Sequence, residues 1–214
     1  GHLVIVDQFI DRTRHRPQSF FGEGLVAHVQ MADPVCPELF EILGDSAKAS
    51  GATFHLGGTS ICIEGPQFST RAESQRYRSW GVDVIGMTSL PEARLAREAE
   101  ICYGAVALST DYDCWHEAED DVTAGAVVAV MAKNVAAAQE VIRQAASRLG
   151  GARGCSCGRA LENALMTSPE AVPAKTYKKL ELLVAHRLPK PKSKGPGKPA
   201  ARRARTGSKA EAAR

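Results

Sequence analysis

Residues 105–115 read Ala-Val-Ala-Leu-Ser-Thr-Asp-Tyr-Asp-Cys-Trp, and the change of character inside this stretch decides the fold class. Residues 105–108 form a short apolar run, which is typical of a buried strand, and two carboxylates, Asp111 and Asp113, follow it. In an open α/β sheet the chemistry gathers where the strands end. The stretch therefore predicts an α/β protein whose functional site lies just beyond this strand.

The segments on either side repeat the alternation of strand and helix. We expect a long irregular loop over residues 11–36, strands at 2–7, 59–63, 82–87 and 103–110, and helices at 37–50, 70–80, 91–100, 123–150 and 158–166. Such an alternation indicates a layered and mostly parallel α/β sheet.

Charge is distributed unevenly along the chain. The net charge is +3, but residues 187–214 contain ten Lys or Arg and one Glu, so the rest of the chain is acidic. Residues from Pro189 on are dominated by Pro, Lys, Gly, Ala and Arg and cannot bury enough surface to order themselves. We expect one domain over residues 1–185 and a basic, disordered tail over 186–214. Weak and unspecific nucleic-acid binding follows from the charge of this tail, and a merely solvated extension is the simpler alternative.

Apolar runs and cysteines bear on the compartment. No apolar run reaches the roughly 18 residues that span a bilayer, and no secretory signal opens the chain, so we expect a cytoplasmic protein without a membrane partner. The six cysteines are Cys36, Cys62, Cys102, Cys114, Cys155 and Cys157. Only Cys155 and Cys157 are closely spaced, and one C-x-C is a poor zinc signature, so the spacing predicts no metal site. Buried reduced thiols are expected, with a disulfide as the alternative.

Three segments, 64–73, 86–92 and 109–115, follow predicted strands. Because the carboxyl ends of parallel strands share one rim, we expect their side chains to converge on one pocket. The candidates are Phe68, Ser69, Met87, Thr88, Asp111 and Asp113. An aromatic ring, a thioether, hydroxyls and carboxylates suit a flat, partly apolar ligand that carries hydrogen-bond donors. Taken singly, the same residues have ordinary structural readings: the acids as a turn, Phe68 and Met87 as core, Ser69 and Thr88 as helix caps.

These three segments resemble the trimeric purine nucleoside phosphorylase family, in its branch that cleaves 5′-methylthioadenosine. Residues 6–13, 16–20 and 31–37 and the Cys155-Ser156-Cys157 stretch are similar to the same family, and the resemblance extends over about residues 1–185. It implies a three-layer mixed sheet flanked by helices. It also implies that the chain is N-terminally truncated, because it opens at a strand that the family reaches only after its first strands.

The resemblance implies a pentosyltransferase of purine and methionine salvage. The reaction is phosphorolysis of S-methyl-5′-thioadenosine to adenine and 5-methylthioribose-1-phosphate, with inorganic phosphate as co-substrate and no cofactor. Asp111 matches the catalytic residue that protonates or hydrogen-bonds the leaving purine, which favours a partly dry site. Asp113 matches the acceptor for the 6-amino group. Relatives that prefer 6-oxopurines place Glu at the position of Ser69 and Asn at that of Asp111.

The remaining roles are carried over in the same way. Phe68 matches a wall of the base or ribose pocket, Met87 a residue beneath the sugar, and Thr88 a phosphate-binding hydroxyl. His28 matches a histidine that one subunit places over the 5′-substituent of the substrate bound in the neighbouring subunit. This arrangement implies a homotrimer. The other phosphate ligands of the family precede the strand at which this chain opens. Two alternatives are therefore a catalytically impaired remnant and a purine nucleoside phosphorylase of other specificity.

Overall fold

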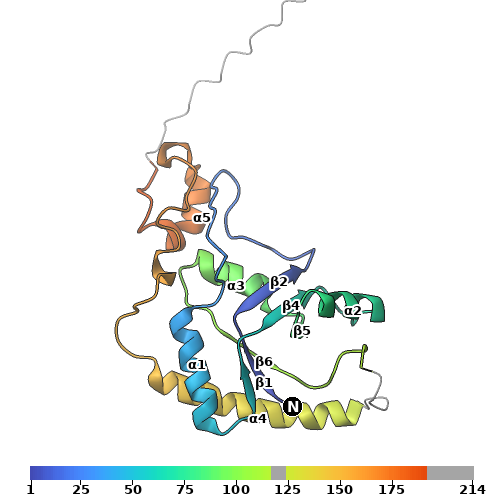
Figure 1. Ribbon diagram of the computed structural model, residues 1–214. Helices are drawn as coiled ribbons and strands as arrows, with labels where there is room; N and C mark the ends of the chain where they lie inside the picture. The colour runs from blue at the N-terminus through green and yellow to red at the C-terminus, as the bar shows by residue number, and fades with distance from the viewer. Residues whose placement is uncertain (117–123, 192–214) are drawn as a thin grey trace, which may run out of the picture.

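The computed structural model describes residues 1–116 and 124–191, and in these ranges the predicted mixed α/β fold is confirmed (Figure 1). The strands, however, form two three-stranded sheets instead of the single sheet that we expected. The first has the order β3-β1-β6, with bounds Phe54–Leu56, Leu3–Val6 and Ala105–Leu108. The second has the order β2-β4-β5, with bounds Gln8–Arg12, Thr59–Ile63 and Val84–Gly86. All pairs are parallel except β1 with β6.

A bend shared by two neighbouring chain segments divides the strands between the sheets. β1 passes into β2 at Asp7, and β3 passes into β4 at Gly57 and Gly58. These glycines have φ values of 85° and 136°, which side chains rarely tolerate. The backbone N–H of Gly58 donates to the Asp7 carboxylate at 3.0 Å and locks the bend. A hydrophobic pattern predicts a strand, but it does not indicate to which sheet the strand belongs. The division into two sheets could therefore not be predicted from the sequence.

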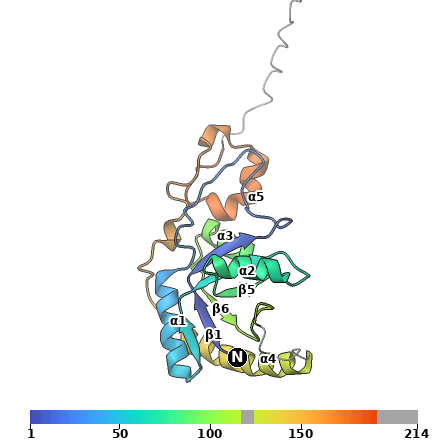
Figure 2. The same ribbon diagram turned by 45° about the vertical axis from the view of Figure 1, so that its right-hand side comes forward.

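Two helices cover the first sheet. α1 (Pro37–Ser50) begins with a proline in its first turn and ends at Gly51 in the left-handed conformation, both as predicted. α4 (Ala124–Arg148) crosses α1, packs against it and lies below the strands of the first sheet (Figure 2). The core between them is made by Leu3, Ile5, Leu43, Ala47, Val141 and Ala145.

Two shorter helices accompany the second sheet. α2 (Arg71–Ser79) is capped by Thr70, whose hydroxyl accepts from the N–H of Glu73 while the Glu73 carboxylate accepts from the N–H of Thr70. These bonds lower the pKa of Glu73. α3 (Ser89–Glu98) follows β5. The capping box fixes the chain just before α2, and so it fixes the position of Ser69.

The C-terminal part differs most from expectation. In place of a helix over 158–166 there is a short 3-10 turn, η1 (Cys157–Arg159), followed by chain whose backbone pairs with residues 26–28 of the loop. A second turn, η2 (Pro169–Ala171), precedes an unforeseen helix, α5 (Ala174–Val184), which packs on the same loop around Leu25.

Ordered chain continues beyond the predicted boundary at residue 185. Leu188 is buried, and the side chains of His186 and Arg187 bond to the Glu100 carboxylate at 2.5 and 3.0 Å. The described structure thus continues a few residues past residue 185, to residue 191. Most of the predicted tail, residues 192–214, lies outside the described ranges. Within them, no helix has the length and apolarity that a bilayer crossing requires.

Candidate active site

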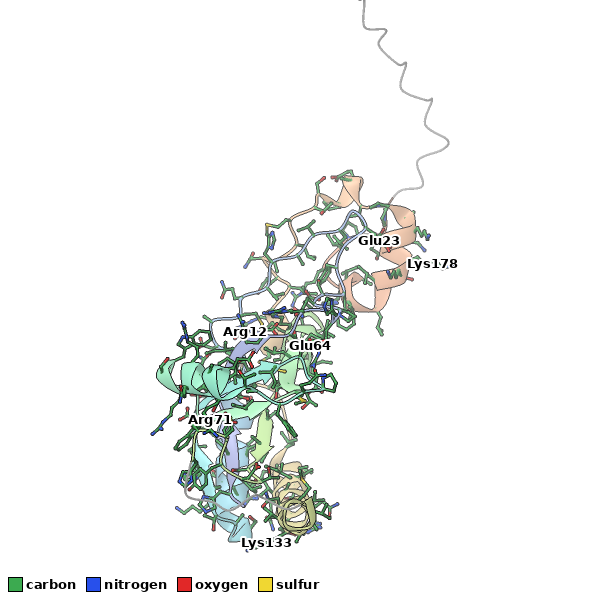
Figure 3. The ribbon with its side chains drawn as sticks, turned by 90° about the vertical axis from the view of Figure 1, so that its right-hand side faces the viewer. Arg12, Glu23, Glu64, Arg71, Lys133 and Lys178 are labelled. Atoms are coloured by element: carbon green, nitrogen blue, oxygen red, sulfur yellow. The ribbon has the colours of Figure 1, made fainter. Side chains whose placement is uncertain are left out.

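Ser69 and the stretch that follows β6 lie against each other. The thiol of Cys114 donates to the carbonyl oxygen of Ser69 at 3.8 Å, and the guanidinium of Arg71, labelled in Figure 3, donates to the carbonyl oxygen of Cys114. The guanidinium of Arg78 lies 3.9 Å from the centroid of the Trp115 ring, in cation–π geometry. Cys114 and Trp115 thus contact α2 at its first residue and in its last turn.

The route by which these residues meet differs from the expected one. β6 runs antiparallel to β1 and ends beside its start, where the N–H of Ser109 donates to the carbonyl oxygen of His2. The end of β6 therefore does not share a rim with the ends of β4 and β5, and the shared-rim argument was wrong for this strand. Residues 109–116 cross to α2 instead.

Four side-chain atoms of residues 69–79 and 109–116 are shielded from solvent and have no hydrogen-bond partner among the described residues. They are Oγ of Ser69 and Oδ2 of Asp113, which belong to predicted site residues, and Oγ of Ser74 and Nδ1 of His116. The other oxygen of Asp113 accepts from the N–H of Cys114 at 2.8 Å, which orients the carboxylate. Leaving such a group unpaired costs about 1 to 3 kcal/mol. A bound molecule that offers hydrogen-bond donors would remove this cost.

Phe68 and Asp111 are exposed. The Phe68 side chain is 88% accessible, which is unusual for a phenylalanine but suitable for a ligand-covering wall. The Asp111 carboxylate accepts from the Thr110 hydroxyl at 2.8 Å. The described part of the chain does not supply the enclosure that we expected around Asp111.

Met87 and Thr88 follow β5. The Met87 sulfur packs so closely on Gly65 that a Cβ there would lie 2.7 Å from it, and Gly65 has a φ of 69°. Thr88 is exposed at the start of α3, and its side chain makes no capping hydrogen bond. The helix-cap reading of Thr88 is therefore not observed.

Sequence reasoning missed the role of Arg16. Its guanidinium donates to the carbonyl oxygens of Met87 at 2.6 Å, Leu90 at 2.7 Å and Glu64 at 2.9 Å, and it pairs with the Glu64 carboxylate. Glu64 lies at the end of β4, as Figure 3 shows. Arg16 thus ties the end of β4 to the end of β5. The only sequence signal was an arginine inside a long loop.

His28 does not join the other candidates within this chain. Its side chain is exposed, and its backbone N–H donates to the carbonyl oxygen of Ala164. In residues 1–116 and 124–191, no hydrogen bond connects the His28 ring with Ser69, Asp111 or Asp113. A role toward a neighbouring subunit stays a prediction.

A cavity of about 390 Å³ lies elsewhere, lined among others by Asp7, Gln8, Asp33, Phe40 and Arg97. None of the predicted site residues lines it. The Asp7 carboxylate is already occupied by the N–H of Gly58. The unpaired atoms of Ser69 and Asp113 are therefore the better guide to the site.

Comparison with known proteins gives an independent result. The family model of the phosphorylase superfamily matches residues 1–147. The chain is 57% identical over 185 residues to the S-methyl-5′-thioadenosine phosphorylase of Geobacter sulfurreducens, covering 86% of this chain and 65% of that protein. It is 53% identical over 182 residues to the protein of the same name from Koribacter versatilis, covering 85% and 62%. The chain thus spans just under two thirds of the length of these relatives.

Solved structures agree with the sequence relatives. A methylthioadenosine phosphorylase from an antarctic soil metagenomic library superposes with a TM-score of 0.81 at 46% identity, covering 86% of this chain and 65% of that one. An adenosine/methylthioadenosine phosphorylase mutant of Schistosoma mansoni in complex with adenine gives 0.67 at 31% identity, covering 71% and 60%.

Proposed function

This chain belongs to the phosphorylase superfamily, and on that premise we propose that it acts in the phosphorolysis of S-methyl-5′-thioadenosine. The products are adenine and 5-methylthioribose-1-phosphate. The observation that carries the proposal is that Oγ of Ser69 and Oδ2 of Asp113 are both shielded and unpaired among the described residues, on two segments that the contact between Cys114 and Ser69 joins. The similarity to proteins named for this substrate supports it.

Asp113 recognises the 6-amino group of the base. An ionised carboxylate accepts a hydrogen bond from a 6-amino group, but it repels the oxygen of a 6-oxopurine. One Asp113 oxygen is engaged by the N–H of Cys114, so the other is oriented for a ligand. The Ser69 hydroxyl supplies a neutral partner to the purine ring, and the exposed ring of Phe68 offers a face on which base or ribose can stack.

Asp111 assists the departure of the purine. As the bond from the anomeric carbon to the base breaks, its electron pair moves into the purine and the sugar becomes oxocarbenium-like. Asp111 then gives a proton or a hydrogen bond to the imidazole ring, and a phosphate oxygen attacks the anomeric carbon. Met87 lies beneath the sugar, and the free hydroxyl of Thr88 binds phosphate. Because Asp111 is exposed in the described structure, the bound substrate itself supplies part of the enclosure.

The proposal includes a homotrimer in which His28 of one subunit reaches the 5′-substituent in the site of the next. The exposed side chain of His28 is accessible to a neighbouring subunit, as this role requires. The place of action is the cytoplasm, in purine and methionine salvage.

Two measurements test the proposal. The chain is incubated with methylthioadenosine and phosphate, and adenine release is followed by chromatography, with inosine as the competing substrate. Adenine and hypoxanthine binding are measured separately by calorimetry, because binding reports on Ser69 and Asp113 without the chemical step. We expect adenine to bind more tightly than hypoxanthine and methylthioadenosine to be cleaved in preference to inosine. The reverse order in either measurement would overturn the proposed specificity.

A further inference from the structure

Four cysteines from three distant segments meet at one point. They are Cys36 before α1, Cys102 before β6, and Cys155 and Cys157 after α4. All four sulfur atoms lie within 4.8 Å of one another, and those of Cys102 and Cys155 are 3.5 Å apart. Cys36 and Cys157 are buried and the other two are partly buried.

The spacing of the sulfur atoms fits a metal-centred tetrahedron. Zinc–sulfur bonds of about 2.3 Å place the four sulfurs of such a site about 3.8 Å apart. A disulfide would need about 2.05 Å, and all four thiols are free in the structure. Four thiolates without histidine are a donor set that favours zinc.

Two arginines provide the charge that such a site requires. Four thiolates around a divalent ion leave a net negative charge, which needs N–H donors nearby. Nη1 of Arg153 lies 3.9 Å from the Cys102 sulfur, and Nη1 of Arg97 lies 4.0 Å from the Cys157 sulfur. Arg153 is itself held by the carbonyl oxygen of Glu100 at 3.0 Å.

We propose that Cys36, Cys102, Cys155 and Cys157 bind one zinc ion. Each thiol loses a proton as its sulfur coordinates the metal, and four thiolates leave no open position for substrate. The ion therefore has a structural role. It links the segment that follows α4 to the residue before α1 and to the segment that precedes β6. None of the four belongs to the purine site, so this inference does not depend on the proposed reaction.

The test is metal analysis of the protein purified under reducing conditions without chelator. We expect one zinc per chain, and loss of that zinc in Cys157→Ser. The control is Cys114→Ser, which removes an exposed thiol outside the cluster and should keep the zinc. Replacement of zinc by cobalt should give the intense long-wavelength absorption of tetrahedral thiolate coordination.

A second measurement covers the case in which Cys157→Ser does not fold. The unsubstituted protein is alkylated before and after zinc is removed with a chelator, and the modified cysteines are mapped by mass spectrometry. We expect the chelator to expose Cys36, Cys102, Cys155 and Cys157 together, with no change at Cys114. Protein without zinc, whether its four thiols are free or joined in disulfides, would overturn the proposal, as would full zinc content in folded Cys157→Ser.

Discussion

The thiol of Cys114 lies 3.8 Å from the backbone carbonyl oxygen of Ser69, 45 positions away in the sequence. This contact joins the chain that follows β6 to the chain that precedes α2. Asp113 is the chain neighbour of Cys114, so the contact brings its segment against the segment that carries Ser69. Both residues present shielded atoms without partners in the described structure, and the predictions about the base follow from this arrangement.

Replacing Asp113 by Asn should relax the preference for 6-aminopurines. The amide can turn an N–H toward a 6-oxo group, and the bond from the 6-amino group loses its charge. Since a hydrogen bond to a charged group contributes about 1.5 to 3 kcal/mol, the ratio of adenine to hypoxanthine affinity should fall about tenfold or more. Calorimetric titration of both bases measures it, with exposed Asp45→Asn in α1 as control. An unchanged ratio would remove Asp113 from base recognition.

Replacing Ser69 by Ala should weaken adenine binding without destabilising the free protein. The hydroxyl is shielded and unpaired among the described residues, so its removal leaves nothing unsatisfied. We expect adenine affinity to fall by about 1 kcal/mol and the melting temperature to stay constant or rise. The matched control is Ser74→Ala in α2, because the Ser74 hydroxyl is also shielded and unpaired there. Equal adenine affinities in the two variants would contradict the role of Ser69.

Replacing Arg16 by Lys should destabilise the fold although the charge is kept. A lysine cannot reach the carbonyl oxygens of Glu64, Met87 and Leu90 together, as the forked guanidinium does. We expect the free energy of unfolding in urea to fall by about 2 kcal/mol. Arg76→Lys on the exposed surface of α2 serves as control and should change it little. Identical unfolding curves for the unsubstituted protein and Arg16→Lys would show that Arg16 does not hold the ends of β4 and β5 together.

Glu100 should make the stability depend on pH. Burial raises its pKa, but donors from the N–H of Leu161 and from the side chains of His186 and Arg187 outweigh it, so the pKa lies below the ordinary 4.5. A lowered folded pKa means that the carboxylate contributes its full stability above the ordinary pKa of the unfolded chain, and that this contribution is lost as the pH falls from there through the folded pKa. Glu100→Gln should therefore cost about 2 to 3 kcal/mol near pH 7 and progressively less in acid.

The measurement for Glu100 is the difference in unfolding free energy between the two proteins across the acid range. Taking the difference cancels the acid titration of the groups that behave alike in the two proteins. Glu162→Gln, at an exposed position after η1, is the control and should show no pH-dependent difference. A difference that grew toward acid pH would contradict the assigned direction.

Much of the local structure could be predicted from the sequence. The proline of the first turn and Gly51 set the bounds of α1, and the short β-rich run of residues 59–63 set those of β4, because these signals act over a few neighbouring residues. The helix expected over 158–166 failed for a non-local reason. Its first part forms only tight turns, and near its end the carbonyl oxygen of Ala164 and the N–H of Met166 bond to the loop around Ala27.

The site could be predicted in part. Their positions after predicted strands indicate six candidate residues: Phe68, Ser69, Met87, Thr88, Asp111 and Asp113. In the structure, Ser69 contacts the segment that carries Asp113, and Met87 packs on Gly65. The role of Arg16 could not be predicted, because most of its partners are backbone carbonyl groups, which every residue has. The cysteine cluster escaped because its members are spread over residues 36–157 and only two of them are close in the chain.

The sequence by itself determined the family resemblance, the succession of β1, α1, β4, α2, β5, α3, β6 and α4, and the chemical types at the candidate base site, since each depends on residue identity or short-range pattern. Only the tertiary structure decided that the strands divide at Gly57 and Gly58, that β6 runs against β1, and that Cys114 reaches Ser69. These features depend on which distant backbone groups satisfy one another's hydrogen bonds when the chain closes on itself, and a list of residues does not state those pairings.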